Sequence, residues 1–299
     1  MVDDVTDAAG APLGTRHEVS GGAMLLHRSG TGGPAVVFLA GGGMSGLYYW
    51  NVHNLVAEFT TSVLYDRLGL GWSDSVDLPR SGTQVTDDLH ELLRVTAVPG
   101  PHVLVGHSLG GLYARLYAKR FPGEVAGLVL LDPTHEDIVG YLPEEKAQRL
   151  RDVKTGDVFP PEQLDVMRAA YRTTFGRALA GWPAAIREPL LDRGYGREGF
   201  RQSLREPMNL PRLFGEVRAA GPDPDVPLTA GQRQPVAARQ NRDRRPRRNG
   251  HLGRCAESNQ AATRVMAPPS GVSSMTSAAF TSQASPSPDR PELTTGPGS

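Results

Sequence analysis

The chain has 299 residues, and its 32 Lys and Arg balance its 32 Asp and Glu, so the formal net charge at pH 7 is zero. This balance removes the electrostatic argument for nucleic acid or an anionic membrane as a partner. The length suits one large α/β domain or two smaller ones.

The single cysteine, Cys255, excludes an internal disulfide framework and fits a reducing compartment. A signal peptide begins with a basic segment followed by an apolar one, whereas residues 1–7 are acidic, so we expect no signal peptide. No apolar run approaches the length of a membrane span. We therefore expect a cytoplasmic protein that has no membrane partner.

The first half of the chain alternates apolar, strand-like runs with helix-like segments. Residues 35–39 form a continuous apolar run that ends in glycines, as expected for a strand buried on both faces. An apolar stripe at i, i+4, i+7 and i+8 begins at Val85 and predicts an amphipathic helix. Strands joined through helices imply right-handed crossovers and a mostly parallel sheet with flanking helices. The expected strands are 15–19, 24–27, 35–39, 61–65, 102–105 and 125–131, and the expected helices are 47–59, 85–93 and 111–120.

Between the strand at 102–105 and the helix at 111–120 stands the sequence Gly-His-Ser-Leu-Gly, with Ser108 at its centre. A Gly-x-Ser-x-Gly at a strand-to-helix turn is typical of a nucleophile elbow. Its glycines let the strand and the helix approach closely around a serine in a strained backbone conformation. The Ser108 hydroxyl would then project at the helix N-terminus, where free N–H groups can stabilise an oxyanion.

Strand signals stop at about residue 133, and helical spacing interrupted by Gly and Pro continues to about residue 210. We predict a helical insertion over the sheet there, followed by a return helix and a strand that begins at 226–229. After about residue 230, Arg, Ser and Pro dominate and large apolar residues are scarce, so we expect a disordered tail. So abrupt a change of composition is typical of a reading-frame shift or of a wrongly assigned gene end. The expected organisation is an N-terminal core over 1–132, a helical insertion over 133–210, a return to the core over 211–229 and a low-complexity tail over 230–299.

Three further motifs accompany the elbow in a fixed order. They are Phe-Leu-Ala-Gly-Gly-Gly at 38–43, Tyr-Asp-Arg-Leu-Gly-Leu-Gly-Trp-Ser at 65–73 and Leu-Leu-Asp-Pro at 130–133. With these motifs, residues 33–229 resemble the α/β-hydrolase superfamily. The resemblance implies an α/β-hydrolase fold, and it makes the helical segment the family's variable cap, which shapes the substrate pocket.

The resemblance also implies how the reaction is catalysed. Ser108 would be the nucleophile, and the oxyanion hole would use the N–H of Leu109 and one N–H from Gly41 or Gly42. Ala40 stands where many members have a histidine. A serine nucleophile argues against the dehalogenase and epoxide hydrolase branches, whose nucleophile is an aspartate. No metal or organic cofactor is implied, because the sequence has no Cys/His cluster.

The family orders its triad as serine, acid and histidine, and three aspartates are candidates for the acid. Asp132 follows the apolar strand at 125–131, at the position that some members use. Its alternative role is to end the strand and turn the chain. Asp137 is a weaker candidate in the loop beyond, and Asp243 lies inside an arginine-rich block that is typical of solvated charge.

The candidate base is His251, whose Gly-His-Leu context resembles the closing motif of the family. No apolar strand precedes it, so the alternative is a histidine in a disordered tail. His135 lies near the expected pocket rim and could substitute only by rearrangement, and the His107 side chain should point away from the pocket. The remaining histidines fit ordinary strand or helix positions: His17, His27, His53, His90 and His102.

We therefore predict a serine-dependent hydrolase that acts on a small ester, amide, lactone or similar carbonyl substrate through an acyl-enzyme. The alternative is a non-catalytic or truncated hydrolase-fold protein that lacks a working histidine base. Nucleic-acid binding through the basic run at 242–248 is disfavoured, because the run has no interleaved aromatic residues. The sequence does not define the oligomeric state.

Overall fold

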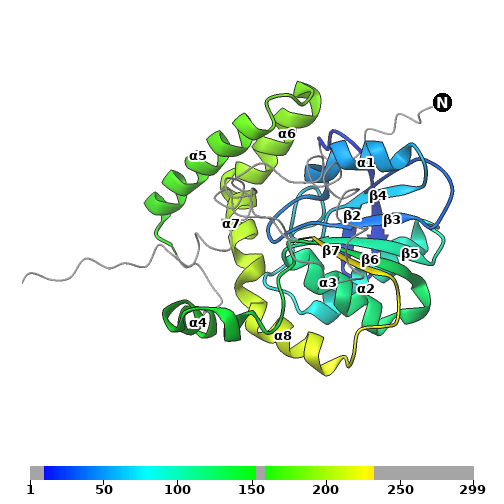
Figure 1. The fold of residues 1–299 in the computed structure, drawn as a ribbon. Coiled ribbons are helices and arrows are strands. Elements are labelled where there is room, and N and C mark those ends of the chain that lie inside the picture. The colour runs from blue at the N-terminus through cyan, green and yellow to red at the C-terminus, as the bar shows by residue number, and fades with distance from the viewer. Residues whose placement is uncertain (1–9, 153–158, 232–299) are drawn as a thin grey trace, which may run out of the picture.

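The structure is a computed structural model that describes residues 10–152 and 159–231. These residues form a seven-stranded sheet in the order β1-β2-β4-β3-β5-β6-β7 (Figure 1). β1 and β2 form an antiparallel hairpin, and β4, β3, β5, β6 and β7 run parallel to one another. The predicted mostly parallel sheet is therefore confirmed. The strands are Thr15–Val19 (β1), Gly22–Ser29 (β2), Val36–Leu39 (β3), Ser62–Tyr65 (β4), His102–His107 (β5), Val125–Leu131 (β6) and Leu228–Gly231 (β7).

Helices cover both faces of the sheet (Figure 1). α1 follows the short 3₁₀ helix η1 and packs on one face, whereas α2, α3 and α8 pack together on the other. This alternation of strands with helices on both sides is the three-layer arrangement that the sequence pattern predicts. The helices of these layers are Gly46–Tyr49 (η1), Trp50–Ala57 (α1), Gly82–Val95 (α2), Leu109–Arg120 (α3), Pro122–Glu124 (η2) and Leu210–Ala219 (α8).

Each face of the sheet has its own hydrophobic core. Successive residues of a strand point to opposite faces, and in β3 Phe38 joins the core on the α1 side while Val37 and Leu39 join the core under α2 and α3. All three are essentially inaccessible to water. Each such side chain stabilises the fold by about 1.5–3 kcal/mol through burial of apolar surface, so β3 is held firmly from both sides.

α2 shows how local signals fix a helix boundary. Ser81 precedes the helix, and its hydroxyl accepts a hydrogen bond from the Gln84 N–H at 3.1 Å, while the Ser81 N–H donates to the Gln84 side chain at 3.0 Å. This reciprocal capping box satisfies amide groups that have no partner inside the helix. The apolar stripe alone places the start of the helix at Val85 and therefore misses its first turn.

Between β6 and α8 the chain forms a helical insertion over residues 138–209, and no strand occurs in its described residues. α5, α6 and α7 stand together at one end of the sheet (Figure 1). Phe175 of α5 is buried against Tyr48 of η1 and Tyr195 of α6, with ring centroids 5.4 and 5.3 Å apart. The insertion therefore packs on the segment that follows β3. Its helices are Ile138–Tyr141 (η3), Glu144–Arg151 (α4), Pro161–Ala178 (α5), Ala184–Tyr195 (α6), Arg197–Arg205 (α7) and Glu206–Asn209 (η4).

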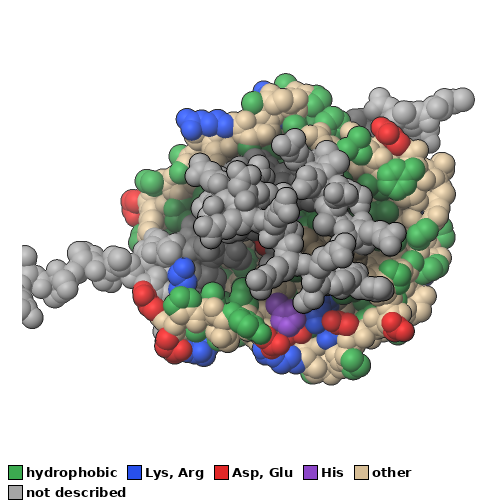
Figure 2. Space-filling model, in the orientation of Figure 1, with side chains coloured by type: hydrophobic (Ala, Val, Ile, Leu, Met, Phe, Trp, Pro, Cys, Tyr) green, Lys and Arg blue, Asp and Glu red, His purple; other side chains and the backbone are tan. Residues whose placement is uncertain are grey.

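The strand predicted to begin at 226–229 is β7, which pairs with β6 in parallel and begins at Leu228. Of the tail predicted over 230–299, the structure describes only residues 230 and 231, and both belong to β7 rather than to a disordered segment. In the part of the chain that the structure describes, no helix is long and apolar enough to cross a bilayer. Figure 2 shows Lys and Arg side chains interspersed with Asp and Glu along the lower edge of the molecule, in keeping with its zero net charge.

Candidate active site

Ser108 lies at the junction of β5 and α3, with φ +50° and ψ −119°. Positive φ is uncommon for a residue with a side chain and stores backbone strain. The flanking glycines have no room for a methyl group, because a Cβ at Gly106 would lie 2.6 Å from the Gly110 carbonyl oxygen. A Cβ at Gly110 would lie 2.1 Å from the Leu39 carbonyl oxygen. Close packing of β5, α3 and β3 thus forces the sharp turn that exposes one serine.

Backbone hydrogen bonds hold this turn against the segment after β6. The Ser108 N–H donates to the Leu131 carbonyl at 3.1 Å, and the Ser108 carbonyl accepts from the N–H of Thr134 at 3.1 Å and of Gly111 at 3.0 Å. Leu109 and Gly110 begin α3, and N–H groups at the start of a helix have no carbonyl one turn earlier in the helix to bond. They carry the positive end of the helix dipole and lie next to the Ser108 side chain.

A glycine-rich loop, residues 40–43, lies beside this helix terminus. It follows β3, and a Cβ built on Gly42 would lie 3.2 Å from the Leu109 Cδ2. The structure thus brings Gly42 and Leu109 together next to Ser108. Two backbone N–H groups in such a place can hold a developing oxyanion.

Gly41, the other predicted donor, faces a different group. Burial raises the pKa of the Tyr49 hydroxyl, and the backbone amide of Gly41 next to that hydroxyl partly offsets the rise. A Cβ at Gly41 would also lie 2.8 Å from the His107 Nδ1, so the buried His107 ring packs against the glycine-rich loop. Of the two glycines, Gly42 is the one that lies against Leu109.

Asp132 occupies the turn immediately after β6, also with positive φ, +44°. Its N–H donates to the Gly231 carbonyl at 2.7 Å. Since both Leu131 and Thr134 are hydrogen-bonded to Ser108, Asp132 lies in a segment that is held directly against the serine. A second strained, non-glycine residue beside the first is typical of functional sites.

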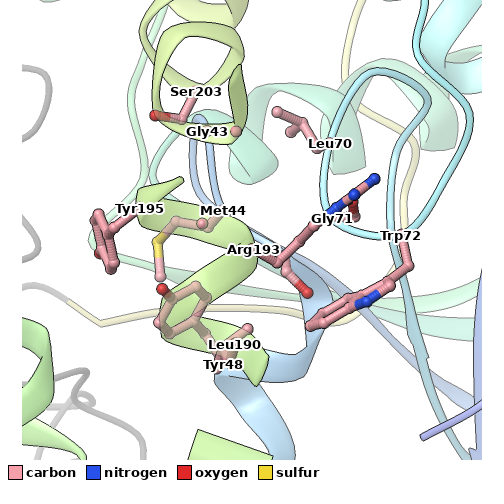
Figure 3. Close-up of a pocket in the computed structure, with 13 residues that line it drawn as sticks. Gly43, Met44, Tyr48, Leu70, Gly71, Trp72, Leu190, Arg193, Tyr195 and Ser203 are labelled. Carbon is pink, nitrogen blue, oxygen red and sulfur yellow. The ribbon is translucent and has the colours of Figure 1, made fainter. Parts of the chain in front are cut away.

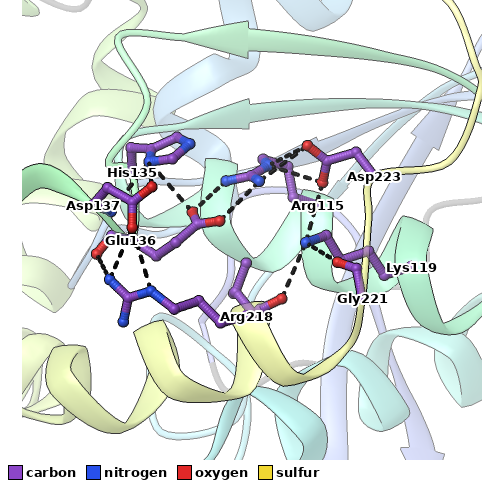
Figure 4. Close-up of polar contacts among 9 residues, drawn as sticks. Arg115, Lys119, His135, Glu136, Asp137, Arg218, Gly221 and Asp223 are labelled. Atoms are coloured by element: carbon purple, nitrogen blue, oxygen red, sulfur yellow. Dashed lines mark hydrogen bonds and ion pairs between the residues drawn. The ribbon is translucent and has the colours of Figure 1, made fainter.

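Ion pairs fasten the segment after Asp132 to α3 (Figure 4). Arg115, two turns beyond Ser108 in α3, binds the Glu136 carboxylate and pairs with Asp223 at 3.0 Å. Asp137, the second candidate acid, pairs with Arg218 at 3.0 Å on an exposed surface. Asp137 thus belongs to this exposed network, whereas Asp132 lies in the turn that is hydrogen-bonded to Ser108.

The sequence analysis gave several histidines no catalytic role, and these histidines have partners elsewhere in the fold. His53 is buried and bonds Ser62 at 2.7 Å, and His90 pairs with Glu124 at 2.9 Å. His135 is more than half exposed and accepts a hydrogen bond from the Asp137 N–H at 3.1 Å. His251, Asp243 and Cys255 lie outside the described residues.

No group of three or more His, Cys, Asp or Glu side chains that could hold a metal ion occurs within residues 10–152 and 159–231. A small cavity of about 20 Å³ lies between the helical insertion and the loops after β3 and β4 (Figure 3). Gly43, Tyr48, Trp72 and Tyr195 are among its lining residues. Substrate pockets are larger by an order of magnitude, so this space is a packing gap of about one water molecule.

The comparison with sequence families identifies the class. The model described as "Alpha/beta hydrolase family" matches residues 36–281, which include the elbow, the glycine-rich loop and part of the chain beyond β7. The chain belongs to this family. Its sheet order, its elbow at β5–α3 and its helical insertion are consistent with that membership.

Individual relatives match shorter stretches. The chain is 32% identical over 121 residues to the uncharacterized protein YqjL of Bacillus subtilis, covering 40% of this chain and 48% of YqjL. It is 33% identical over 103 residues to the putative carbamate hydrolase RutD of Cronobacter turicensis, covering 34% and 38%. The chain therefore spans less than half the length of these curated relatives. Among solved structures it is similar to Cfl2 from Burkholderia cenocepacia, with a TM-score of 0.60, 22% identity, and 72% and 77% of the two chains covered.

Sequence reasoning missed two residues that support the glycine-rich loop. The Arg67 guanidinium is buried and donates to the carbonyls of Ala40 and Gly41, both at 2.8 Å. It also binds Glu206 of η4, whose carboxylate accepts from the Gly43 N–H at 2.6 Å. The Asp-Arg-Leu-Gly-Leu-Gly motif marks Arg67 in the sequence, but no local pattern marks Glu206 as its partner.

Proposed function

We propose that the chain is a serine-dependent hydrolase that cleaves a carbonyl substrate through an acyl-enzyme on Ser108. The observation that carries the proposal is the backbone of Ser108, which is strained at φ +50° between β5 and α3 and closely packed by glycines. Strain of this kind persists only where the surrounding structure imposes it, and it clusters at functional sites. Membership of the α/β hydrolase family supports the same proposal, that the chain is a hydrolase.

In the proposed reaction the Ser108 hydroxyl oxygen attacks the substrate carbonyl carbon, and its proton passes to a histidine. The carbonyl oxygen gains negative charge, which the N–H groups of Leu109 and Gly42 stabilise. The histidine then gives the proton to the leaving alcohol or amine, and water releases the acid from the serine by the reverse route. His251 is the candidate base and Asp132 the residue that would orient it.

The substrate class is a small molecule with an ester, amide, lactone or carbamate carbonyl. The carbamate is included because one relative is named as a putative carbamate hydrolase. The helical insertion would act as the cap that shapes the pocket, since Phe175 of α5 packs on Tyr48 in the segment that follows β3. Nothing in the proposed reaction requires a metal ion or an organic cofactor, a nucleic acid or a membrane.

A fluorophosphonate probe tests the proposal, because it phosphonylates activated serines. Full-length protein should be labelled on Ser108, the Ser108→Ala variant should not be labelled, and the exposed control Ser75→Ala should react as the parent does. Labelling that survives Ser108→Ala contradicts the assignment of the nucleophile.

The competing function is a binding or remnant hydrolase fold without a working base, and the histidines give the specific reason to test it. Those with partners in the described fold, such as His53 and His90, are engaged away from Ser108. His251→Ala should slow labelling on the order of 10³-fold or more if it is the base. Equal labelling of both proteins would favour another base, and no labelling of either protein would favour the remnant.

A further inference from the structure

Arg67 is a charged residue at the centre of the fold, with a side chain only 4% exposed. Its Nε donates to one oxygen of Glu206 at 2.6 Å and its Nη2 to the other at 2.9 Å. Glu206 is equally buried and begins η4, at the end of the helical insertion. The pair therefore joins the loop after β4 to a segment 139 residues later in the chain.

The remaining donors of Arg67 determine the orientation of the glycine-rich loop. Nη1 donates to the Ala40 carbonyl and Nη2 to the Gly41 carbonyl, each at 2.8 Å. The peptide bond between Gly41 and Gly42 is trans, so its C=O and N–H point in opposite directions. By holding the Gly41 carbonyl, Arg67 makes the Gly42 N–H point away from itself.

Glu206 fixes the other end of the same loop. Its carboxylate accepts a hydrogen bond from the Gly43 N–H at 2.6 Å. Gly43 has φ +71°, and a Cβ there would lie 2.4 Å from the Ser203 carbonyl of α7. The loop is thus clamped between Arg67 on one side and the last turn of the insertion on the other.

Stability alone does not explain a charged pair in this place. Well-packed apolar residues of similar volume generally stabilise a core as well as a buried ion pair does. Burial opposes the charge of Arg67, and the Glu206 carboxylate beside it raises the pKa of the guanidinium so that the charge is kept. Apolar residues could not fix the orientation of the loop carbonyls, because only the planar guanidinium, with its several N–H donors, can bind two carbonyls and a carboxylate at once.

We propose that Arg67 and Glu206 are positioning residues that orient the Gly42 N–H towards the oxyanion. Because Glu206 belongs to the end of the helical insertion, this orientation depends on the insertion. The inference rests on the proposed serine hydrolase function. Neither residue touches the substrate in this scheme. Each acts through the backbone of the glycine-rich loop.

The test compares Arg67→Lys and Glu206→Gln with Asp88→Asn, which weakens a largely buried ion pair between Arg80, just before α2, and Asp88 within that helix. For each full-length protein we would measure the second-order rate of Ser108 phosphonylation and the melting temperature. One oxyanion donor contributes about 10²–10³-fold, so we expect the first two variants to label about 10–100-fold more slowly. Asp88→Asn should lose melting temperature and label at the parental rate.

The apolar double variant Arg67→Met/Glu206→Met separates positioning from support of the fold. Because it removes both charges together, it should regain much of the melting temperature that either single change loses. Its labelling should remain slow, because nothing then holds the Gly41 carbonyl. Parental labelling in this double variant, or in both single variants, would overturn the proposal.

Hydrogen exchange of the backbone amides at 40–44 gives a second readout that needs no activity. Exchange should be at least tenfold faster in Arg67→Lys and Glu206→Gln, and unchanged in Asp88→Asn. If the parental protein does not label at all, the proposed function fails, and exchange alone then decides the inference. Unchanged exchange at 40–44 in both variants contradicts the positioning role whether or not Ser108 reacts.

Discussion

Replacing Ser108 by glycine and by alanine separates the strain of the elbow from its chemistry. Both variants lose the hydroxyl, so both should lose nucleophilic activity. They differ in how they fit the backbone, because φ +50° with ψ −119° is a conformation that glycine adopts freely and alanine does not. We expect Ser108→Gly to be the more stable of the two.

The size of the difference follows from two opposing effects. A residue with a side chain in a sparsely populated conformation costs about 1–3 kcal/mol, and Ser108→Gly removes that cost. Glycine also makes the unfolded chain more flexible, which costs about 0.4–1 kcal/mol relative to alanine. The net advantage of Ser108→Gly over Ser108→Ala is therefore about 1 kcal/mol, or about 3 °C in melting temperature.

Urea unfolding and thermal melting of the two variants measure this difference. The matched control is Thr173, an exposed residue in the middle of α5. There Thr173→Gly should be less stable than Thr173→Ala by about 0.5–1 kcal/mol, the opposite sign. If Ser108→Gly is less stable than Ser108→Ala by the same amount as at the control position, the backbone of Ser108 is not strained and the reasoning is wrong.

Three further predictions concern residues around the site and in the core. Gly110→Ala should destabilise the protein by about 3 kcal/mol or more, because the new Cβ would lie 2.1 Å from a backbone oxygen. The control Gly123→Ala, which has open space around it, should change the free energy of unfolding in urea by less than about 0.5 kcal/mol. Asp132→Asn should reduce ester turnover by about 10⁴-fold with the fold intact, since the wrong histidine tautomer is then favoured; a change of a few-fold would make Asp132 a strand-ending residue. Burial lowers the pKa of His53 from 6.5 to about 4. The folded protein therefore favours the neutral imidazole, and this contribution to the free energy of unfolding is complete above pH 6.5. As the pH falls from 6.5 to 4, up to about 3 kcal/mol of that stability is lost. The His53→Gln variant should lack this slope in urea unfolding, and an equal slope in both proteins would refute the assignment.

The core strands and the elbow were predictable because their signals are local. A continuous apolar run such as 35–39 has few alternatives to a buried strand, and a serine between glycines at a strand-to-helix boundary has a specific geometry. Strand and helix positions followed to within a few residues. The first turn of α2 was missed because its boundary depends on a hydrogen-bonded capping box at Ser81 rather than on apolar spacing.

The support of the glycine-rich loop could not be predicted in this way. Arg67 sits in a recognisable motif, but Glu206 is a single acidic residue in a helical segment with no feature that distinguishes it from its neighbours. Only the fold brings a residue 139 positions later to the guanidinium. A pattern in one sequence carries no information about such a pairing, because nothing local constrains either partner.

Arg67 and Glu206 lie far apart in the sequence, and this separation affects how the site forms during synthesis of the chain. Ribosomes deliver the N-terminal part of a chain first, and domains tend to fold in that order. A growing chain presents Ser108 and the glycine-rich loop long before it presents Glu206, whose bond to the Gly43 N–H spans 163 residues. In the proposed scheme the nascent chain therefore carries a serine without an organised oxyanion site. The hydrolytic centre matures only after the helical insertion is complete.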